Sequence, residues 1–277
     1  MSILDTLVAA SREAAEHRQS LVPVAALEQR SAFHAPTLGL RRALRRPDGL
    51  AFIAECKAAS PSEGRIRPEY HPARHAHAYK QAAASAISIL TEESQFGGSL
   101  DHLARVRAEV DLPLLRKDFI TTPYQIAEAR AFGADAVLLI AAALDAPRLA
   151  ALVDEAHRLG LGVLLEVHSE EEAEMADGAV DLASVEAVGV NHRDLKTFSV
   201  DLALSERILP HLPAATVRVA ESGVRTGEDA ARLRAVGADA LLVGTALMRE
   251  PDPGRALARL RRETAIAVAA LSTRTPA

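Results

Sequence analysis

The sequence predicts an α/β protein built as a single (β/α)8 barrel, the TIM-barrel fold, with an N-terminal helical extension. Short apolar segments alternate with amphipathic helical segments, and eight strand candidates can be counted. The strand candidates are almost continuously apolar, as is typical of parallel strands buried on both faces. No Gly-rich dinucleotide-binding motif follows any of them, and no break in composition divides the chain. Eight βα units therefore favour a closed barrel over a doubly wound sheet.

The strand candidates share one pattern along the chain. Each is rich in Leu, Val, Ile or Ala and precedes a turn and a helical segment. The segments GADAVLLI at 133–140 and GADALLVG at 237–244 are alike, as expected of a repeating βα architecture. The predicted strands are 50–57, 86–92, 112–118, 136–142, 162–168, 186–192, 216–222 and 240–246.

The chain is expected to hold one barrel domain without a linker. Its 277 residues suit such a barrel, which typically needs about 250. Residues 1–48 precede the first βα unit and are predicted to form one or two extra helices packed on the barrel, with 2–17 the clearest. The barrel is assigned to 49–271, and 272–277 are expected to be a frayed tail.

Composition and charge exclude several classes of function. Lys and Arg number 32 against 37 Asp and Glu, a net charge of −5, which argues against nucleic acid or an anionic membrane as the main partner. Cys56 is the only cysteine, so there is no disulfide framework. The N-terminal residues carry Asp5 and lack the apolar core of a secretory signal, and no apolar run reaches the roughly 20 residues of a membrane helix. We expect a cytoplasmic protein.

Charged and polar residues gather where the predicted strands end. In the stretch AECKAASPSEG, Glu55 and Lys57 stand two residues apart, so their side chains share one face of the strand. In a (β/α)8 barrel, the carboxyl ends of the strands open into the active-site mouth. One such pair could be structural, but a set drawn from several strands predicts an acid–base site. These residues are Glu55, Lys57, Lys117, Glu166, Asn191, Arg193, Glu221, Ser222, Gly223, Gly244 and Thr245.

The ends of the seventh and eighth predicted strands carry a second signal. They read ESGV and VGTAL, and small residues there let backbone N–H groups face a ligand. In barrels this is a frequent phosphate site, completed by a helix N-terminus. Lys57 and Arg193 could add positive charge, so we expect a small phosphorylated substrate.

These stretches together resemble the indole-3-glycerol phosphate synthase family over essentially residues 1–260. The matching motifs are AECKAASPSEGRI, ISILTEESQFGGS, LLRKDFITTPYQIAEARAFGADAVLLI, LLEVHSEEE, VGVNHRDLKTFSVDL, AESGV and LLVGTALM. The resemblance implies a carboxy-lyase of tryptophan biosynthesis. Its substrate would be 1-(2-carboxyphenylamino)-1-deoxyribulose 5-phosphate, which undergoes ring closure, decarboxylation and dehydration to indole-3-glycerol phosphate. No cofactor and no metal are expected, and we expect a monomer or a weak homodimer.

The resemblance also implies roles for individual residues. Lys117 matches the general acid that protonates the ketone, and Lys57 matches the lysine that holds the substrate carboxylate and phosphate region. Glu166 matches an acid–base carboxylate of the later steps. The other matches are Glu55 and Asn191 at the sugar hydroxyls, Ser60 near the substrate carboxylate, Phe96 and Phe119 around the anthranilate ring, and Arg193, Glu221, Ser222, Gly223, Gly244 and Thr245 at the substrate and its phosphate.

The division of the proton transfers stays open at this point. Burial and a second lysine in the mouth would lower the pKa of a lysine, whereas the nearby carboxylates would raise it. Two other functions are possible. Phosphoribosylanthranilate isomerase is a barrel enzyme that pairs a cysteine with an aspartate, but Cys56 is expected to point toward the helix layer. A non-catalytic barrel would lack a proton-transfer residue, and all the expected ones are present.

Several other polar features are not assigned to the site. His71, His75 and His77 are expected to lie on a solvated helix face and not to bind a metal. His192 is expected to point away from Asn191 with little effect on the chemistry. The acidic run 170–174 is expected to open a helix as a capping, solvated face.

Overall fold

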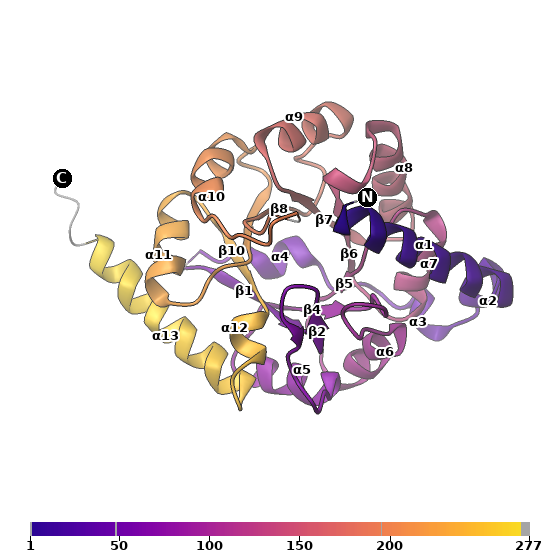
Figure 1. Ribbon diagram of the computed structural model, residues 1–277, viewed down its shortest axis with the longest axis horizontal. Helices are drawn as coiled ribbons and strands as arrows, with labels where there is room; N and C mark the ends of the chain where they lie inside the picture. Colours follow the sequence, from indigo (N-terminus) through magenta and orange to yellow (C-terminus); the bar gives the residue numbers. More distant parts are fainter. Residues whose placement is uncertain (1, 48, 195, 273–277) are drawn as a thin grey trace.

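The computed structural model describes residues 2–47, 49–194 and 196–272, and it shows a closed barrel of eight parallel strands. Neighbouring strands follow the order of the sequence, and the first strand pairs with the last, Ala51 against Ala240, to close the ring (Figure 1). The predicted strands are confirmed, because each observed strand lies inside its predicted range. They are β1 (Ala51–Cys56), β4 (Ala86–Leu90), β5 (Leu114–Lys117), β6 (Ala136–Ile140), β7 (Gly162–Val167), β8 (Ala187–Asn191), β9 (Val217–Glu221) and β10 (Ala240–Val243).

Alternate residues of each strand divide between two apolar layers. In β1, Ala51 and Ile53 face the barrel interior, whereas Ala54 and Cys56 pack with residues of the surrounding helices. The interior is filled by aliphatic side chains and is therefore a packed core, not a channel. The same alternation brings Glu55 to the inner face at the end of β1, where the apolar core gives way to polar side chains.

A ring of helices surrounds the strands, and several begin at residues that the sequence marks clearly. Thr122 accepts a hydrogen bond from Gln125 N, the Gln125 side chain accepts one from Thr122 N, and Pro123 occupies the first turn of α7. Thr226 and Asp229 form the same capping box at α11. The outer helices are α5 (Pro72–Gln81), α6 (Leu100–Glu109), α7 (Pro123–Ala131), α8 (Ala146–Arg158), α9 (Glu170–Ala179), α10 (Ala203–Ile208), α11 (Gly227–Ala235) and α13 (Pro253–Ser272), with the short turns η1 (Ala141–Ala143), η2 (Leu209–His211) and α12 (Thr245–Met248).

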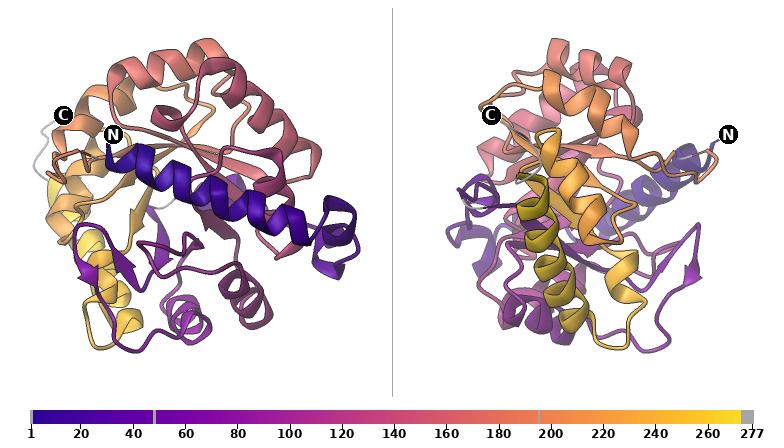
Figure 2. Two further views of the ribbon diagram at one scale, coloured as in Figure 1. Left: turned by 45° about the vertical axis from the view of Figure 1, so that its right-hand side comes forward. Right: turned by 90° about the vertical axis from the view of Figure 1, so that its left-hand side faces the viewer.

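The N-terminal segment holds more helices than the one or two that were predicted. They are α1 (Ile3–Leu21), α2 (Val24–Leu27), α3 (Ser31–His34) and α4 (Leu40–Leu44). The last three span four or five residues each, too few to show a helical period in the sequence. Leu40 and Leu44 of α4 pack with the interior core next to β1 and β4, and α4 is visible through the ring of strands (Figure 1). By contrast, α1 lies across the carboxyl ends of the strands (Figure 2).

A buried network of ion pairs and hydrogen bonds connects α1 with β5. The fully buried guanidinium of Arg116 lies 2.9 Å from Asp118 and 3.3 Å from Glu128 of α7. From α1, Ser11 Oγ donates to Asp118 at 2.8 Å, and Arg18 Nε donates to Glu128 at 2.5 Å. Each charge in this network has a partner, so its burial is compensated, and α1 is held in place over the mouth.

The surroundings of Asp118 keep it ionised. Burial alone would raise the pKa of this carboxyl, but the charge of Arg116 and the hydrogen bonds from Thr91, Arg116 and Ser11 hold the pKa below its usual value. A carboxylate whose pKa is lowered by folding stabilises the fold at pH values above its unfolded pKa. That contribution is lost as the pH falls through the folded pKa.

The C-terminal helix α13 packs against α11 and α5 on the outside of the barrel (Figure 1). It runs through Ser272, so the first residue of the predicted tail belongs to the helix. Residues 273–277, the rest of that predicted tail, lie outside the described part of the chain. Among the described residues, no helix has the length and apolar character needed to cross a membrane.

Candidate active site

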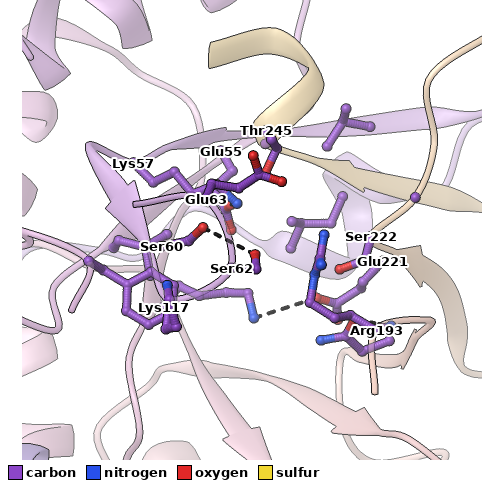
Figure 3. A pocket seen from close by; sticks show the side chains of 18 of the residues that line it. Glu55, Lys57, Ser60, Ser62, Glu63, Lys117, Arg193, Glu221, Ser222 and Thr245 are labelled. Carbon is purple, nitrogen blue, oxygen red and sulfur yellow. Dashed lines mark hydrogen bonds and ion pairs between the residues drawn. The ribbon is translucent and has the colours of Figure 1, made fainter. Parts of the chain in front are cut away.

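A cavity of about 380 Å³ opens at the carboxyl ends of the barrel strands (Figure 3). Side chains at the ends of all eight barrel strands line it, together with the loops that follow and the first turns of α1. The structure places on this wall every residue that we assigned to the site from the sequence. These are Glu55, Lys57, Ser60, Phe96, Lys117, Phe119, Glu166, Asn191, Arg193, Glu221, Ser222, Gly223, Gly244 and Thr245.

Two lysines enter the cavity from different strands, and carboxylates hold each of them. Lys57 Nζ lies 2.9 Å from Glu55 Oε1. Lys117 Nζ lies 2.8 Å from Glu166 Oε2 and 3.6 Å from Glu221 Oε2. The two lysine side chains are 13% and 14% exposed, whereas the three carboxylates are almost fully buried. The ammonium groups are therefore the parts of these pairs that a substrate can reach.

The neighbouring carboxyl groups keep Lys117 in its protonated, positively charged form. Burial alone would lower the pKa of its ammonium group, but the neighbouring carboxyl groups, Glu166 first, outweigh burial and raise that pKa above its usual value. Lys117 is therefore protonated at neutral pH. From the sequence alone, it was open whether burial or the neighbouring carboxylates would determine the pKa of this lysine. A charged ammonium is the form that a general acid must have before it donates a proton.

Glu166 and Glu221 are neighbours in opposite protonation states. Burial works against ionisation of Glu166, but the charges of Lys117 and His168 hold its pKa well below the usual range. For Glu221, burial and the charge of Glu166 raise the pKa well above the usual range. A hydrogen bond between the two carboxyl groups acts in the same directions, since it lowers the pKa of Glu166 and raises that of Glu221. One proton thus rests on Glu221 while Glu166 is ionised, an arrangement that suits the two groups for different tasks.

Two glycines make room for the buried carboxylates. A Cβ at Gly189 in β8 would lie 2.0 Å from Glu221 Oε1. A Cβ at Gly244, after β10, would lie 2.2 Å from Glu55 Oε1. Both distances are far below van der Waals contact, so any larger residue would displace the carboxylate from its lysine. Gly189 could not be found from the sequence, because a glycine inside a strand does not show which side chain needs the space.

The turn after β9 has an unusual backbone. Ser222 and Gly223 both have positive φ angles, 65° and 84°. A Cβ at Gly223 would lie 2.5 Å from Val200 Cγ1, so space and conformation both require glycine there. Positive φ is unfavourable for Ser222, and a hydrogen bond from His192 Nδ1 to the Ser222 carbonyl oxygen, 2.8 Å long, holds the turn. His192 Nε2 lies 2.7 Å from Ser205 Oγ on the other side of the ring.

The His192 side chain therefore contacts the predicted phosphate site through the backbone carbonyl of Ser222. Burial lowers the pKa of His192, so the ring is neutral at neutral pH and can donate from Nδ1 while Nε2 accepts from Ser205. The next residue, Arg193, donates from its backbone N to Asn191 Oδ1 at 3.1 Å and from Nη1 to the Phe198 carbonyl at 3.0 Å. Arg193 and Ser222 lie on the same side of the cavity, opposite Lys117 (Figure 3).

An apolar wall completes the cavity. The rings of Phe96 and Phe119 pack with centroids 6.1 Å apart and planes tilted by 43°. Ile3, Leu4 and Leu7 of α1 line the same space. The three α1 residues could not be assigned to the site from the sequence, because an apolar helical stripe predicts packing without naming the surface it packs on.

The loop after β1 folds over one side of the cavity as a short hairpin. Its strands are β2 (Ala59–Ser60) and β3 (Gly64–Arg65), and the hydroxyls of Ser60 and Ser62 lie 3.4 Å apart at its turn. Glu63 of this hairpin forms an ion pair with Arg249, which follows α12. This pair could not be predicted, because 186 positions separate its members in the sequence.

One expectation about polar residues was wrong. His75 is buried and packs against Tyr70 with ring centroids 5.8 Å apart, and burial lowers its pKa to about 4, so it does not lie on a solvated face. The acidic run 170–174 opens α9 as predicted, and Glu172 in its first turn accepts a hydrogen bond from His168 N at 2.7 Å. The expectation for Cys56 is confirmed, since this thiol is buried in the helix-facing layer.

The fold and the site define a class of protein. It is a (β/α)8-barrel enzyme that combines a charged lysine, an ionised and a protonated carboxyl group, an aromatic wall and a strained turn after its seventh barrel strand. Such a set is suited to acid–base chemistry on a substrate with an apolar end and an anionic end.

Comparison with known proteins identifies the family. The family model for indole-3-glycerol phosphate synthase matches residues 4–260. Indole-3-glycerol phosphate synthase of Salinibacter ruber is 49% identical over 265 residues, covering 95% of this chain and 96% of that protein. Indole-3-glycerol phosphate synthase 2 of Streptomyces coelicolor is 48% identical over 252 residues, covering 91% and 96%. The chain belongs to the indole-3-glycerol phosphate synthase family, and it is a carboxy-lyase of tryptophan biosynthesis.

A solved structure supports the fold independently. Thiamine phosphate pyrophosphorylase from Pyrococcus furiosus superposes with a TM-score of 0.60 at 18% identity, covering 83% of this chain and 99% of that one. At this identity the likeness concerns the barrel fold alone. The family model and the two relatives, in contrast, match residues 4–260 and 95% and 91% of this chain, so the motifs of the mouth fall within the matched region.

Proposed function

We propose that this cavity converts 1-(2-carboxyphenylamino)-1-deoxyribulose 5-phosphate to indole-3-glycerol phosphate, with Lys117 as the general acid. The observation that carries this assignment is the charged ammonium of Lys117, 2.8 Å from Glu166, at the wall of the cavity. Two further features support the proposal: the Phe96–Phe119 pair offers an apolar surface for the anthranilate ring, and the turn at Ser222, across the cavity from Lys117, is assigned to the phosphate (Figure 3).

The first step joins a carbon of the anthranilate ring to the ketone carbon of the substrate. As the bond forms, Lys117 Nζ gives its proton to the ketone oxygen, which becomes a hydroxyl group. The ring is left with a positive charge shared with its nitrogen, as an iminium. That electron-poor centre takes up the electron pair of the bond to the carboxylate, and CO₂ leaves without the help of a cofactor.

The last step removes water and forms the indole double bond. The hydroxyl group takes up a proton and leaves as water, and a base removes a proton from the carbon that lies between the nitrogen and the former ketone carbon. Lys57, paired with Glu55, is assigned to the leaving hydroxyl, and ionised Glu166 is assigned to acid–base work in this step. The low pKa of Glu166 supports a base that is available before each turnover.

The remaining site residues are proposed to bind the substrate. Arg193, Ser222 and Gly223, with Gly244 and Thr245, are assigned to the phosphate. Ser60 is assigned to the substrate carboxylate, and Asn191 with Glu221 to the sugar hydroxyls. Glu221 is protonated, so it can donate a hydrogen bond to a hydroxyl group as well as accept one.

The proposal is tested by mixing purified protein with the substrate and following indole fluorescence. The chain contains no Trp, so the protein contributes little signal at these wavelengths. We expect a rising trace for the wild type and a fall in kcat of about 100-fold or more for Glu166→Gln. A flat wild-type trace with folded protein and verified substrate contradicts the proposal. Turnover of phosphoribosylanthranilate in its place would favour the isomerase reaction. The position of Cys56 argues against that reaction, because its thiol is buried in the layer that faces the helices and not the cavity.

We also propose the setting in which the enzyme works. Residues 1–48 form an extension of the barrel and not an independent domain, since α1 supplies part of the cavity wall. The protein is a cytoplasmic monomer or weak homodimer without nucleic-acid or membrane partners, in keeping with its net charge of −5. Light scattering coupled to gel filtration tests the oligomeric state, and a stable tetramer would contradict it.

A further inference from the structure

His168 stands behind Glu166 and has none of the roles proposed above. It directly follows β7, and its ring lies between two carboxylates. Its Nε2 lies 3.4 Å from Glu166 Oε1, and its Nδ1 lies 3.3 Å from Glu172 Oε2. The side chains of His168 and Glu166 are only 10% and 3% exposed, so water screens this row of charges weakly.

The two oxygens of Glu166 face different cations. Oε2 faces Lys117 at 2.8 Å, and Oε1 faces His168. A rotation of the carboxylate would disturb both contacts at once. Glu172 in turn fixes His168, because its Oε2 also accepts a hydrogen bond from His168 N at 2.7 Å. The row Lys117–Glu166–His168–Glu172 alternates in sign from the cavity to the start of α9.

We propose that His168 is a positioning residue whose cationic ring, held by Glu172, keeps the Glu166 carboxylate ionised with Oε2 aimed at Lys117. This inference rests on the acid–base role proposed for Glu166. His168 itself is not among the residues that line the cavity.

The charges that face the ring support its protonated form. Burial alone would lower the pKa of His168, but the hydrogen bond with Glu172 and the charges of Glu166 and Glu172 raise it above the usual value, although Lys117 opposes them. These groups come from β7, α9 and β5. Nε2 has no hydrogen-bond partner among the described residues, so Glu166 receives charge from the ring more than a directed hydrogen bond.

The test compares His168→Gln and Glu172→Gln with the wild type over a range of pH. An opposite charge within about 4–6 Å moves a carboxyl pKa by about 1–3 units, so the acid limb of kcat in His168→Gln should move up by about one pH unit or more. At neutral pH, kcat should fall by about tenfold with KM changed by less than about threefold. Glu172→Gln should move the acid limb in the same direction by less, because it weakens the charge on His168.

His157 offers a matched control. It is another histidine next to a glutamate, with Nε2 3.6 Å from Glu186 Oε2; its side chain is 34% exposed, and it lies outside the cavity lining. His157→Gln should leave kcat and its pH profile unchanged. Superposition of the acid limbs of His168→Gln and the wild type would overturn the inference. Equal losses in His168→Gln and His157→Gln would also overturn it, by showing a general effect on folding.

Two further measurements separate the possible failures. If Glu166→Gln keeps wild-type kcat, the proposed role of Glu166 fails; if Glu166→Gln is inactive while His168→Gln behaves like the wild type, only the inference about His168 fails. Should His168→Gln not fold, ¹⁵N NMR of the wild-type imidazoles decides the question. A doubly protonated His168 ring at pH 7 supports the inference, and a neutral ring overturns it.

Discussion

The space at Gly189 leads to a specific prediction about catalysis. In Gly189→Ala, the new Cβ would lie 2.0 Å from Glu221 Oε1 and 3.1 Å from its Cδ. Ordinary contact needs about 3.5 Å, so the carboxyl group must move by about 1.5 Å. Its other oxygen lies 3.6 Å from Lys117 Nζ, so the shift changes the surroundings of the proposed general acid.

The expected effect follows from that displacement. A misplacement of about 1 Å in a catalytic arrangement can lower the rate by about 100-fold, so kcat should fall by about that factor. Overpacking of a buried site should also reduce the free energy of unfolding by about 1–3 kcal/mol. Steady-state fluorescence assays give kcat, and urea denaturation gives the stability.

A second glycine provides the control for this experiment. Gly178 lies on the exposed side of α9, and a Cβ added there would have no neighbouring atom within 4 Å, so Gly178→Ala should leave kcat unchanged and stabilise the helix by up to about 1 kcal/mol. The reasoning is refuted if Gly189→Ala folds normally and keeps kcat within about threefold of the wild type. Such a result would mean that the position of the Glu221 carboxyl group does not matter to turnover.

Three further predictions concern the phosphate site and the buried network. Arg193→Ala should raise KM more than it lowers kcat, because Arg193 is assigned to the substrate phosphate, and an unchanged KM in steady-state assays would contradict this. His192→Ala should also raise KM, since it removes the hydrogen bond to the Ser222 carbonyl; inorganic phosphate should compete more weakly in this variant, and equal inhibition would remove His192 from the phosphate site. Asp118→Asn should reduce the free energy of unfolding by about 3–5 kcal/mol at pH 7, because it breaks a buried pair with Arg116. The difference in denaturant unfolding should shrink below about pH 4 as Asp118 takes up a proton, and a difference that grows there would contradict the assignment.

The barrel could be predicted from the sequence because local patterns carry it. Eight apolar runs mark the strands, and capping residues such as Thr122 and Thr226 mark the helix starts. The ends of parallel strands meet at one edge whatever the details of packing, so Glu55, Lys117 and Glu166 could be placed together without a structure. Helices α2, α3 and α4 were not predicted individually, because they are too short to show a helical period in the sequence.

The features that could not be predicted depend on contacts between distant segments. Nothing in the sequence places Leu7 of α1 at the cavity, and nothing pairs Glu63 with Arg249. The charge of Lys117 also needed the structure, because burial and neighbouring carboxylates act in opposite directions and only distances show which is stronger. The burial of His75 and the contact between His168 and Glu172 likewise arise from packing that helical spacing does not reveal.

The most direct test of the account is the rate of a single turnover in Lys117→Met. Excess enzyme is mixed with 1-(2-carboxyphenylamino)-1-deoxyribulose 5-phosphate, and indole fluorescence is followed in time. Methionine fills similar space but carries no proton to donate, so the rate should fall by about 100-fold or more while binding of the product, measured by its fluorescence, changes by less than about tenfold. A single-turnover rate near that of the wild type would contradict the assignment of Lys117 as the general acid.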